Sequence, residues 1–534
     1  MLKNKLTNEK LDLKSSIYKR ITNPFYLIAV ALTAIGTYGF YLANPSPSID
    51  WLSYDKYYSG VLFGQGRFTA TIVERVLGLW NCPVWFEPIL GLVCFILGTL
   101  IMLAIFDGFI EYKSIVPSIV FTCIYITFPL LPEYFIYNGA ILTVGGCTVL
   151  PSLALYFRIK YRDFSRGSLL PIILLIFVVS GYECMILPYI GMVFALFILI
   201  EHESGKLKFK EIIVKGFYFA FPLGLSVILE FIITRILIKL FSIKINNNAN
   251  ISTLWTKSPN PIISLFSSYF SNWFSKIFFN PAFAVLFAAG IIFFVLFIIR
   301  IKKTKSFSSV LLFLGLLLTV FAMTLYRCGG AEFRTEQGMP FFVAFTAFLL
   351  SLHVKSGKKF TQRLFASVFV FALIIQIGAS NKSYWINNQR YEEEKNVILT
   401  LNSRITENFD SSKPVVFIGF YKMSDNLMEK ITIDESTRYA KALRRFLTDK
   451  SYKAAIKKYD YIGNSYLAWS VRYPFDADKP DSELYKFCNY IGVSFKQCTK
   501  EQFDEAKKKY SKIKPYPSKD CIVETDEYIV VNLG

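Results

Sequence analysis

The polar residues able to do chemistry in this sequence stand between long apolar runs. One stretch, residues 44–80 (NPSPSIDWLSYDKYYSGVLFGQGRFTATIVERVLGLW), carries Asp50, Asp55 and Arg67 among aromatic residues and glycines, directly after a run of membrane length. A carboxylate can take the proton from a hydroxyl nucleophile, while cations neutralise a departing phosphate. These residue types therefore suit transfer onto a hydroxyl from a phosphate-activated donor.

Other charged residues share this compartment in the topology derived below. The further carboxylates are Glu74, Glu87, Glu133, Glu183, Glu332 and Glu336, and the further cations are Lys56, Arg75, Arg235, Lys239, Arg327 and Arg334. Arg235 and Lys239 stand one helical turn apart near the end of an apolar run, where they could hold a lipid phosphate; snorkelling to the interface explains them equally well. The segment RCGGAEFRTEQG joins a double glycine to Arg327 and Arg334, although a surface loop is the alternative.

Each residue proposed for catalysis could instead have a purely structural role. A loop carboxylate such as Asp50 or Asp55 is more often solvated or capping. The DAD at 476–478 is similar to the metal-binding DxD of soluble glycosyltransferases, but it falls where nucleotide sugars are absent, so we interpret it as a turn. The chain has two histidines and lacks P-loop, dinucleotide and zinc patterns. We therefore expect no cofactor and leave a divalent cation open.

The composition predicts the elements that position these residues. At 534 residues, 53% hydrophobic and 18% charged, the chain fits a polytopic α-helical membrane protein rather than a soluble one. A bilayer core of about 30 Å needs about 20 apolar residues per helix. Eleven runs approach that length, near 25–43, 86–106, 115–132, 134–157, 168–183, 184–200, 212–241, 281–299, 308–326, 339–354 and 364–381.

The distribution of the net charge of +20 orients these runs. With residues 1–24 in the cytoplasm, the connections on that side are 107–114, 158–167, 201–211, 300–307 and 355–363, which hold most of the loop Lys and Arg. The excess of Lys and Arg over Asp and Glu therefore orients the helices in the membrane. We expect no nucleic-acid partner. Segments 44–85 and 242–280 then lie outside. The runs at 168–183 and 184–200 are separated only by a very short turn, and merging them would move the carboxy-terminal tail into the cytoplasm.

Two outer segments have patterns of their own. Within 261–279, apolar residues recur at helical spacing opposite serines, which predicts an amphipathic helix in the outer interface or a packed loop helix. Residues 382–534 have a soluble composition and predict a small α/β domain. Its expected elements are a strand in KPVVFIGF, helices in ESTRYAKALRRFLTD and KEQFDEAKKKYSK, and a hairpin in CIVETDEYIVVNLG with a turn near Asp526. A disulfide among Cys488, Cys498 and Cys521 stays open.

This layout resembles the Gtr-type (GtrII-like) O-antigen glucosyltransferases of serotype-converting phages and enteric bacteria. In that family the first external loop tends to read Asp-Asp, followed by Gly-Arg some sixteen residues on. Asp50 and Gly66-Arg67 match that spacing, while Trp51 replaces the second acid. The tail from residue 491 also resembles the family's ending, in which a helix leads to a Tyr-Pro turn and a final hairpin.

The resemblance implies a GT-C-class membrane glycosyltransferase in the bacterial inner membrane, with its active site facing the periplasm. It would move glucose from polyprenyl-phosphate-glucose to a hydroxyl of a lipid-linked O-antigen repeat, with a donor synthase and a flippase acting upstream. Asp50, or failing that Asp55, would be the base of an inverting transfer. Arg67 would hold the donor phosphate, with help from Arg235, Lys239, Arg327 or Arg334.

Two other functions fit the same outline. One is an O-antigen polymerase or another polyprenyl-dependent sugar transferase. The other is a polysaccharide or lipid transporter, which is disfavoured because the sequence shows no internal repeat with matched broken helices.

Overall fold

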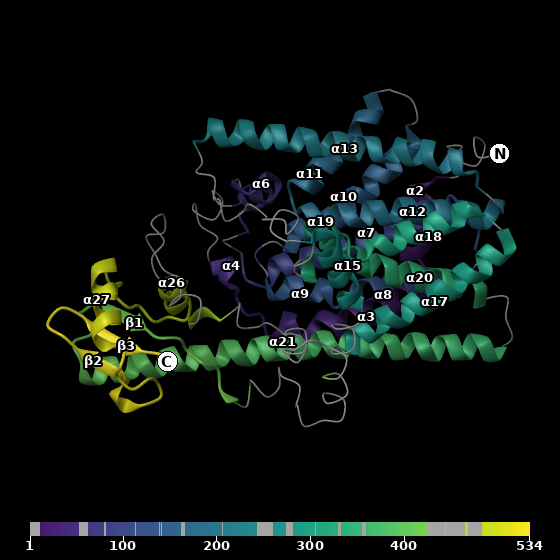
Figure 1. The fold of residues 1–534 in the computed structure, drawn as a ribbon. Helices are drawn as coiled ribbons and strands as arrows, with labels where there is room; N and C mark the ends of the chain where they lie inside the picture. The colour runs from purple at the N-terminus through teal and green to yellow at the C-terminus, as the bar shows by residue number, and fades with distance from the viewer. Residues whose placement is uncertain are drawn as a thin grey trace. The chain divides into compact units, whose positions relative to one another are not determined.

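The computed structural model divides the chain into two compact units (Figure 1). The first comprises Met1–Ala43, Ser59–Phe135 and Ala140–Asn381, and the second comprises Asn44–Tyr58, Ile136–Gly139 and Lys382–Gly534. Within these units the structure describes all residues except 1–10, 53–61, 63, 80–81, 113, 138, 140, 162–165, 206, 243–259, 274–280, 305, 329–332, 355–358, 426, 428–443, 445–464 and 468–482. Each unit is described by itself.

The first unit is a bundle of apolar helices. Its main helices are α3 (Pro24–Ala43), α7 (Phe86–Asp107), α8 (Val116–Thr127), α9 (Leu130–Ile136), α10 (Ile141–Lys160), α11 (Leu170–Val179), α12 (Ile186–Ser204), α13 (Phe209–Leu240), α17 (Pro281–Thr304), α18 (Phe307–Thr319) and α20 (Gly338–Val354). The first part of α21 (Lys359–Asn408) also belongs to this unit, and its residues from Lys382 on belong to the second. Helix α2 (Leu13–Ile21) precedes the main helices, and the shorter elements between them are α6 (Phe68–Leu77), η4 (Glu183–Met185), α15 (Pro261–Ser271), α19 (Ala322–Arg327) and η7 (Phe333–Thr335).

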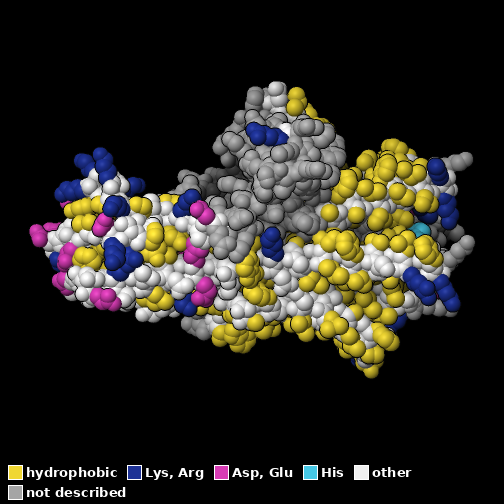
Figure 2. Space-filling model, turned by 90° about the horizontal axis from the view of Figure 1, so that it is seen from below, with side chains coloured by type: hydrophobic (Ala, Val, Ile, Leu, Met, Phe, Trp, Pro, Cys, Tyr) yellow, Lys and Arg dark blue, Asp and Glu magenta, His cyan; other side chains and the backbone are white. Residues whose placement is uncertain are grey.

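Length and composition make this unit a polytopic helical membrane domain. Among the described residues, seven helices are long and apolar enough to cross a bilayer, or eight if α8 and α9 form one bent span. The helices α11, α18 and α20 are shorter but apolar. The peripheral α13 and α21 leave most of their apolar windows exposed, and Figure 2 shows hydrophobic side chains covering the flank of the bundle. Such a surface is stable against lipid and costly against water.

Several of the predicted runs have different limits in the structure. The run expected at 134–157 begins within α9 and continues as α10, and the run expected at 364–381 belongs to the longer α21. The run expected at 115–132 breaks after Thr127, where α8 and α9 meet at a 41° bend. Phe128 has an extended backbone at the break because the following Pro129 disfavours a helical conformation there. The run expected at 308–326 likewise divides into α18 and α19.

Helices α7 and α10 pack closely because glycines face each other. A Cβ on Gly145 would lie 2.7 Å from the carbonyl oxygen of Gly91, and a Cβ on Gly91 would lie 2.9 Å from that of Ile141. Small residues let apolar helices approach until their backbones touch. At the same contact, the Glu87 carboxylate accepts a 2.9 Å hydrogen bond from the Leu142 N–H and so caps the first turn of α10.

The segments predicted to be cytoplasmic meet at one end of this bundle. Arg20 on α2 is 1% exposed and forms a two-point ion pair with Asp107, with both N–O distances 2.8 Å. Arg300 pairs with Glu201, and the Phe209 and Phe307 rings lie 6.2 Å apart. Lys and Arg side chains gather at this end, at the right of Figure 2.

Helices α11 and α12 are separate and run in opposite directions. The start of α11 lies at the basic end, where a Cβ on Gly167 would touch the Tyr161 ring. The end of α12 also lies there, because Glu201 accepts a hydrogen bond from Ser309 (2.7 Å). The chain therefore reverses at residues 180–182, as the two-run interpretation predicts.

Helix α15 is the start of the amphipathic segment predicted within 261–279. Its Tyr269 hydroxyl donates to the Leu317 carbonyl (2.9 Å), and Trp273 is buried, as the packed-helix alternative predicts. Ile262 and Phe266 on the same helix are exposed, as an interfacial helix requires. Residues 274–280 lie outside the described part of the chain.

The second unit contains a small three-stranded sheet in the order β1-β3-β2. Strand β1 (Val415–Ile418) pairs in parallel with β3 (Ile529–Asn532), which pairs antiparallel with β2 (Ile522–Glu524). The helices α26 (Glu483–Tyr490) and α27 (Lys500–Tyr510) accompany the sheet. The predicted strand, the second predicted helix and the closing hairpin are thus present, while all of ESTRYAKALRRFLTD except Arg444 lies outside the described residues.

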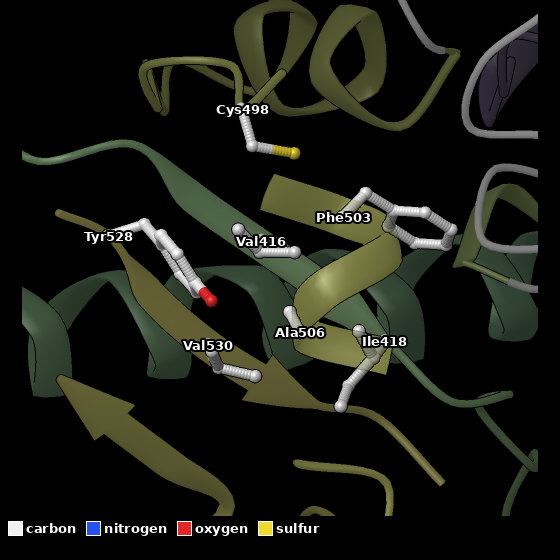
Figure 3. Close-up of a cluster of buried hydrophobic side chains, with 7 residues drawn as sticks. All are labelled: Val416, Ile418, Cys498, Phe503, Ala506, Tyr528 and Val530. Carbon is white, nitrogen blue, oxygen red and sulfur yellow. The ribbon is translucent and has the colours of Figure 1, made fainter. Parts of the chain in front are cut away.

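The core of the second unit lies between the sheet and α27. It consists of Val416, Ile418, Cys498, Phe503, Ala506, Tyr528 and Val530 (Figure 3). Cys498 is one of these apolar side chains, and Cys488 and Cys521 are likewise buried as free thiols. The structure therefore does not contain the disulfide that the sequence left open.

Candidate active site

Arg67 lies at the amino terminus of α6 in a polar cluster of the first unit. Its Nη2 is 3.4 Å from each carboxylate oxygen of Glu183, and its guanidinium lies over the Tyr182 ring, 4.6 Å from the centroid. Tyr182 and Glu183 come from the turn between α11 and α12. The Arg67 side chain is 26% exposed, so a ligand can reach it without unfolding the site.

Gly66 lets the backbone before Arg67 approach α13. Its φ of +81° lies in the left-handed region that glycine adopts without strain. A Cβ at this position would lie 2.9 Å from Glu230 Oε1 and 3.6 Å from the Thr234 hydroxyl oxygen. Glu230 itself accepts a 2.6 Å hydrogen bond from Thr234. The Gly-Arg pair is thus seated against the carboxy-terminal half of α13.

Arg334, which is distant from Arg67 in the sequence, also lies near Tyr182. Its carbonyl oxygen accepts hydrogen bonds from the Tyr134 hydroxyl (2.6 Å) and Gln337 Nε2 (2.7 Å). The Tyr134 ring meets Tyr182 edge to face, with centroids 5.8 Å apart. Tyr134 and Gln337 therefore hold the Arg334 backbone beside Tyr182.

The electrostatics of Tyr182 reflect both arginines. Burial raises the pKa of its phenol well above the ordinary value, while the positive charges of Arg67 and Arg334 act in the opposite direction. The phenol consequently stays neutral at physiological pH. The Arg67 guanidinium lies over this neutral ring, and the Arg334 charge is close enough to act on the same phenol. A guanidinium in such surroundings can donate charge-assisted hydrogen bonds to a phosphate.

The other predicted cations lie in different surroundings. Arg235 and Lys239 are exposed on α13, and the Arg235 guanidinium lies 5.1 Å from the Phe231 ring centroid, itself on the apolar surface. This environment is the one that snorkelling predicts. Arg327 is half-buried at the end of α19, and no described contact joins it to Arg67.

Two of the outer carboxylates have structural roles. Glu336 is 1% exposed and accepts hydrogen bonds from the Met323 and Thr324 N–H groups and from the Thr324 hydroxyl, which caps α19. Glu87 caps α10 in the same way. Among the described residues, no group of three or more His, Cys, Asp or Glu could hold a metal ion.

Asp50 belongs to the second unit rather than to the unit of Arg67. It is part of the short helix α4 (Ile49–Leu52), whose start is capped by Ser48: its hydroxyl accepts a 3.0 Å hydrogen bond from the Trp51 N–H. The other predicted base, Asp55, and the DAD at 476–478 lie outside the described residues.

Sequence reasoning singled out Arg67, Glu183 and Arg334 but missed their neighbours. Tyr182, Tyr134 and Gln337 look like ordinary residues beside apolar runs, and their role depends on contacts between distant segments. Glu230 could have been found from the sequence, because a carboxylate inside a membrane-length apolar run costs free energy unless it has a partner or lines a cavity.

The comparisons with known proteins give one match. The model of a protein family described as glucosyl transferase GtrII matches residues 39–351, more than half of the 534-residue chain. The matched region includes Asp50 and the whole Arg67 cluster. No curated protein and no solved structure matches the chain.

Proposed function

Because this chain belongs to the glucosyl transferase GtrII family, we propose that it transfers glucose from polyprenyl-phosphate-glucose to a hydroxyl of a lipid-linked O-antigen repeat. The reaction takes place at the periplasmic face of the bacterial inner membrane and changes the serotype. The enzyme has the GT-C architecture, and a donor synthase and a flippase supply its lipid donor.

The observation that carries this proposal is the pair Arg67 and Arg334 beside Tyr182, at the end of the bundle away from the basic connections. Glu230, which meets the Gly66 loop, lies 21 positions along α13 from Phe209, at the basic end. At 1.5 Å per residue this is about 30 Å, the thickness of a bilayer's hydrocarbon core. A phosphate bound there would lie at the headgroup level, where a polyprenyl phosphate presents it.

The proposed mechanism is an inverting displacement at the anomeric carbon. Asp50, or failing that Asp55, takes the proton from the acceptor hydroxyl as its oxygen forms the new bond to C1. The bond from C1 to the phosphate oxygen breaks, and polyprenyl phosphate leaves with the electron pair. Arg67 and Arg334 neutralise the phosphate charge, and Arg235, Lys239 and Arg327 are further cations that could assist the lipid phosphate.

Purified protein in lipid vesicles with labelled polyprenyl-phosphate-glucose and lipid-linked glycan tests the proposal. We expect label in the glycan together with free polyprenyl phosphate. The Asp50→Asn variant should insert normally and lose this transfer, because an amide cannot accept the hydroxyl proton. Wild-type activity in that variant would remove Asp50 from the mechanism. Glycan elongation without glucose gain would indicate a polymerase, and movement of lipid without bond formation would indicate a transporter.

A further inference from the structure

The segment that carries Asp50 packs on the carboxy-terminal part of the chain. Residues 44–58 belong to the same compact unit as Lys382–Gly534, although more than 300 residues separate them in sequence. Ser46 and Ser48 are each 1% exposed within this unit. A loop whose polar residues are buried to this extent has a defined conformation rather than a solvated one.

Contacts from two different elements, α21 and α26, help to hold this segment. Asn387, on the polar second half of α21, is 2% exposed and donates a 2.7 Å hydrogen bond from Nδ2 to the Ser46 hydroxyl. Tyr490, the last residue of α26, meets the Trp51 ring edge to face, with centroids 5.7 Å apart and an interplanar angle of 78°. The two contacts lie on either side of Asp50 in the sequence.

The element that presents Tyr490 is itself anchored to the sheet. Tyr485, earlier in α26, donates a hydrogen bond from its hydroxyl to the Val415 carbonyl at the start of β1 (2.5 Å). The Phe487 ring stacks on Tyr466 with centroids 4.1 Å apart. The support for Trp51 therefore extends into the core of the unit.

We propose that the carboxy-terminal domain holds the Asp50 segment in place for the transfer reaction, with Asn387, Tyr490 and Trp51 as positioning residues. This inference rests on the proposed function, in which Asp50 is the base. A proton acceptor displaced by about 1 Å can lower the rate by about 100-fold, so a base on a short helix needs such support. The domain thus acts on the chemical step and leaves donor binding to Arg67 and Arg334.

Steady-state kinetics of the full-length protein test this role. Asn387→Leu and Tyr490→Ala should each lower kcat at least tenfold while the KM for polyprenyl-phosphate-glucose stays within twofold. Trp51→Phe keeps an aromatic ring for the edge-to-face contact and should retain most of kcat, whereas Trp51→Ala should not. Phe420→Ala is the matched control, because Phe420 and Tyr490 are aromatic residues of this unit with similar exposure, 46% and 41%. Equal kcat in Tyr490→Ala and Phe420→Ala would overturn the inference.

Hydrogen exchange provides a readout that needs no turnover. Amides of residues 46–52 should lose protection in Asn387→Leu and Tyr490→Ala, while amides of β1 keep theirs and show that the domain is folded. Unchanged protection at 46–52 would overturn the positioning role and leave the proposed function standing. A wild-type protein that is protected at 46–52 yet transfers no glucose would instead overturn the proposed function, and with it the role assigned to the contacts.

Discussion

At the scale of single residues, the proposed binding of the donor phosphate depends most on Arg67. Its guanidinium is planar, lies over Tyr182 and can offer two parallel N–H groups to a phosphate. We predict that Arg67→Ala lowers kcat/KM for the lipid donor by about 100- to 1000-fold, the range for losing one donor to a developing oxyanion. Arg67→Lys should recover only part of this, because an ammonium keeps the charge without the planar stacking.

Arg235, the exposed arginine on α13, is proposed only to assist the lipid phosphate, so its loss should cost far less than the loss of Arg67. Arg235→Ala should leave kcat/KM within about threefold of wild type, the size expected for an exposed charge near a lipid surface. The measurement is the same radiolabel assay over a range of donor concentrations. Equal losses in Arg235→Ala and Arg67→Ala would mean that the phosphate is held along α13 and not beside Tyr182.

A second residue-scale prediction concerns Glu394, on the second half of α21. Burial raises the pKa of Glu394 to about 7, although the Arg390 charge and hydrogen bonds from Ser465 and the Tyr466 N–H oppose the shift. Between the unfolded value near 4.3 and pH 7, the folded state holds a proton that the unfolded chain has lost. The free energy of unfolding of the second unit should therefore fall by about 4 kcal/mol as pH rises through this window, and then level off.

Thermal unfolding of the full-length protein in detergent at pH 5, 6, 7 and 8 measures this effect. Labelling of the buried Cys488 thiol reports when the second unit opens. Glu394→Gln can still accept a hydrogen bond from the Tyr466 N–H, so it should be nearly insensitive to pH across the same range. Parallel pH curves for wild type and Glu394→Gln would show that another group titrates.

Sequence reasoning could find those functional candidates whose residue type is rare in their surroundings, such as charged residues beside apolar runs. Arg67 and Glu183 are charged residues beside apolar runs, and the cost of leaving them unpaired near a membrane is what predicts a role. Tyr182 and Gln337 carry no such cost. Tyr182 contacts Arg67 across more than 100 residues of chain, and Gln337 contacts the Tyr134 hydroxyl across 203. Periodicity in one sequence cannot reveal such contacts.

At the scale of elements, the Gly66 turn determines how α6 presents Arg67. Alanine at position 66 would be strained at φ +81° and would place a Cβ 2.9 Å from Glu230 Oε1. We predict that Gly66→Ala costs about 1 kcal/mol of stability from the left-handed backbone. It should also lower kcat/KM at least tenfold, because Arg67 shifts when the turn moves away from α13.

Gly78 provides the matched control at the other end of α6. Its φ is +60°, but a Cβ there would meet nothing within 4 Å. Gly78→Ala should show a similar loss in thermal stability and keep kcat/KM within about twofold, since only the backbone strain is shared. Identical kinetics for the two variants would mean that the contact with Glu230 does not position Arg67.

Most helices could be predicted from the length of the apolar runs. Breaks within a run could be predicted only where a helix-breaking residue marks them. The break between α8 and α9 falls before Pro129, so the sequence contained that signal. The length of α21 was not predicted, because its apolar part ends near residue 381 and the helix continues through polar residues to Asn408. Its second half is held by packing such as that of Asn387 and Glu394, which a hydropathy scan does not detect.

At the scale of the whole molecule, the sequence predicted a membrane part and a carboxy-terminal part but assigned residues 44–58 to the former. The structure groups them with the latter. Apolar runs identify what lies in lipid, and they say nothing about which outer segments pack together. Ser46 and Trp51 contact residues more than 300 positions away, and such pairings become visible only in three dimensions.

The final prediction is the orientation of the whole chain in the membrane. The sequence predicts eleven apolar runs, with 168–183 and 184–200 counted as two. Because eleven is an odd number of crossings, it predicts that Gly534 lies on the side of the membrane opposite residues 1–24. Because Lys- and Arg-rich connections stay in the cytoplasm, alkaline phosphatase fused after Gly534 should be active, and a fluorescent protein fused there should be dark. Fusions after Lys303, at the basic end of α17, should give the reverse result. A fluorescent Gly534 fusion would put the carboxy-terminal domain in the cytoplasm, away from any periplasmic acceptor, and would refute the proposed reaction at that face.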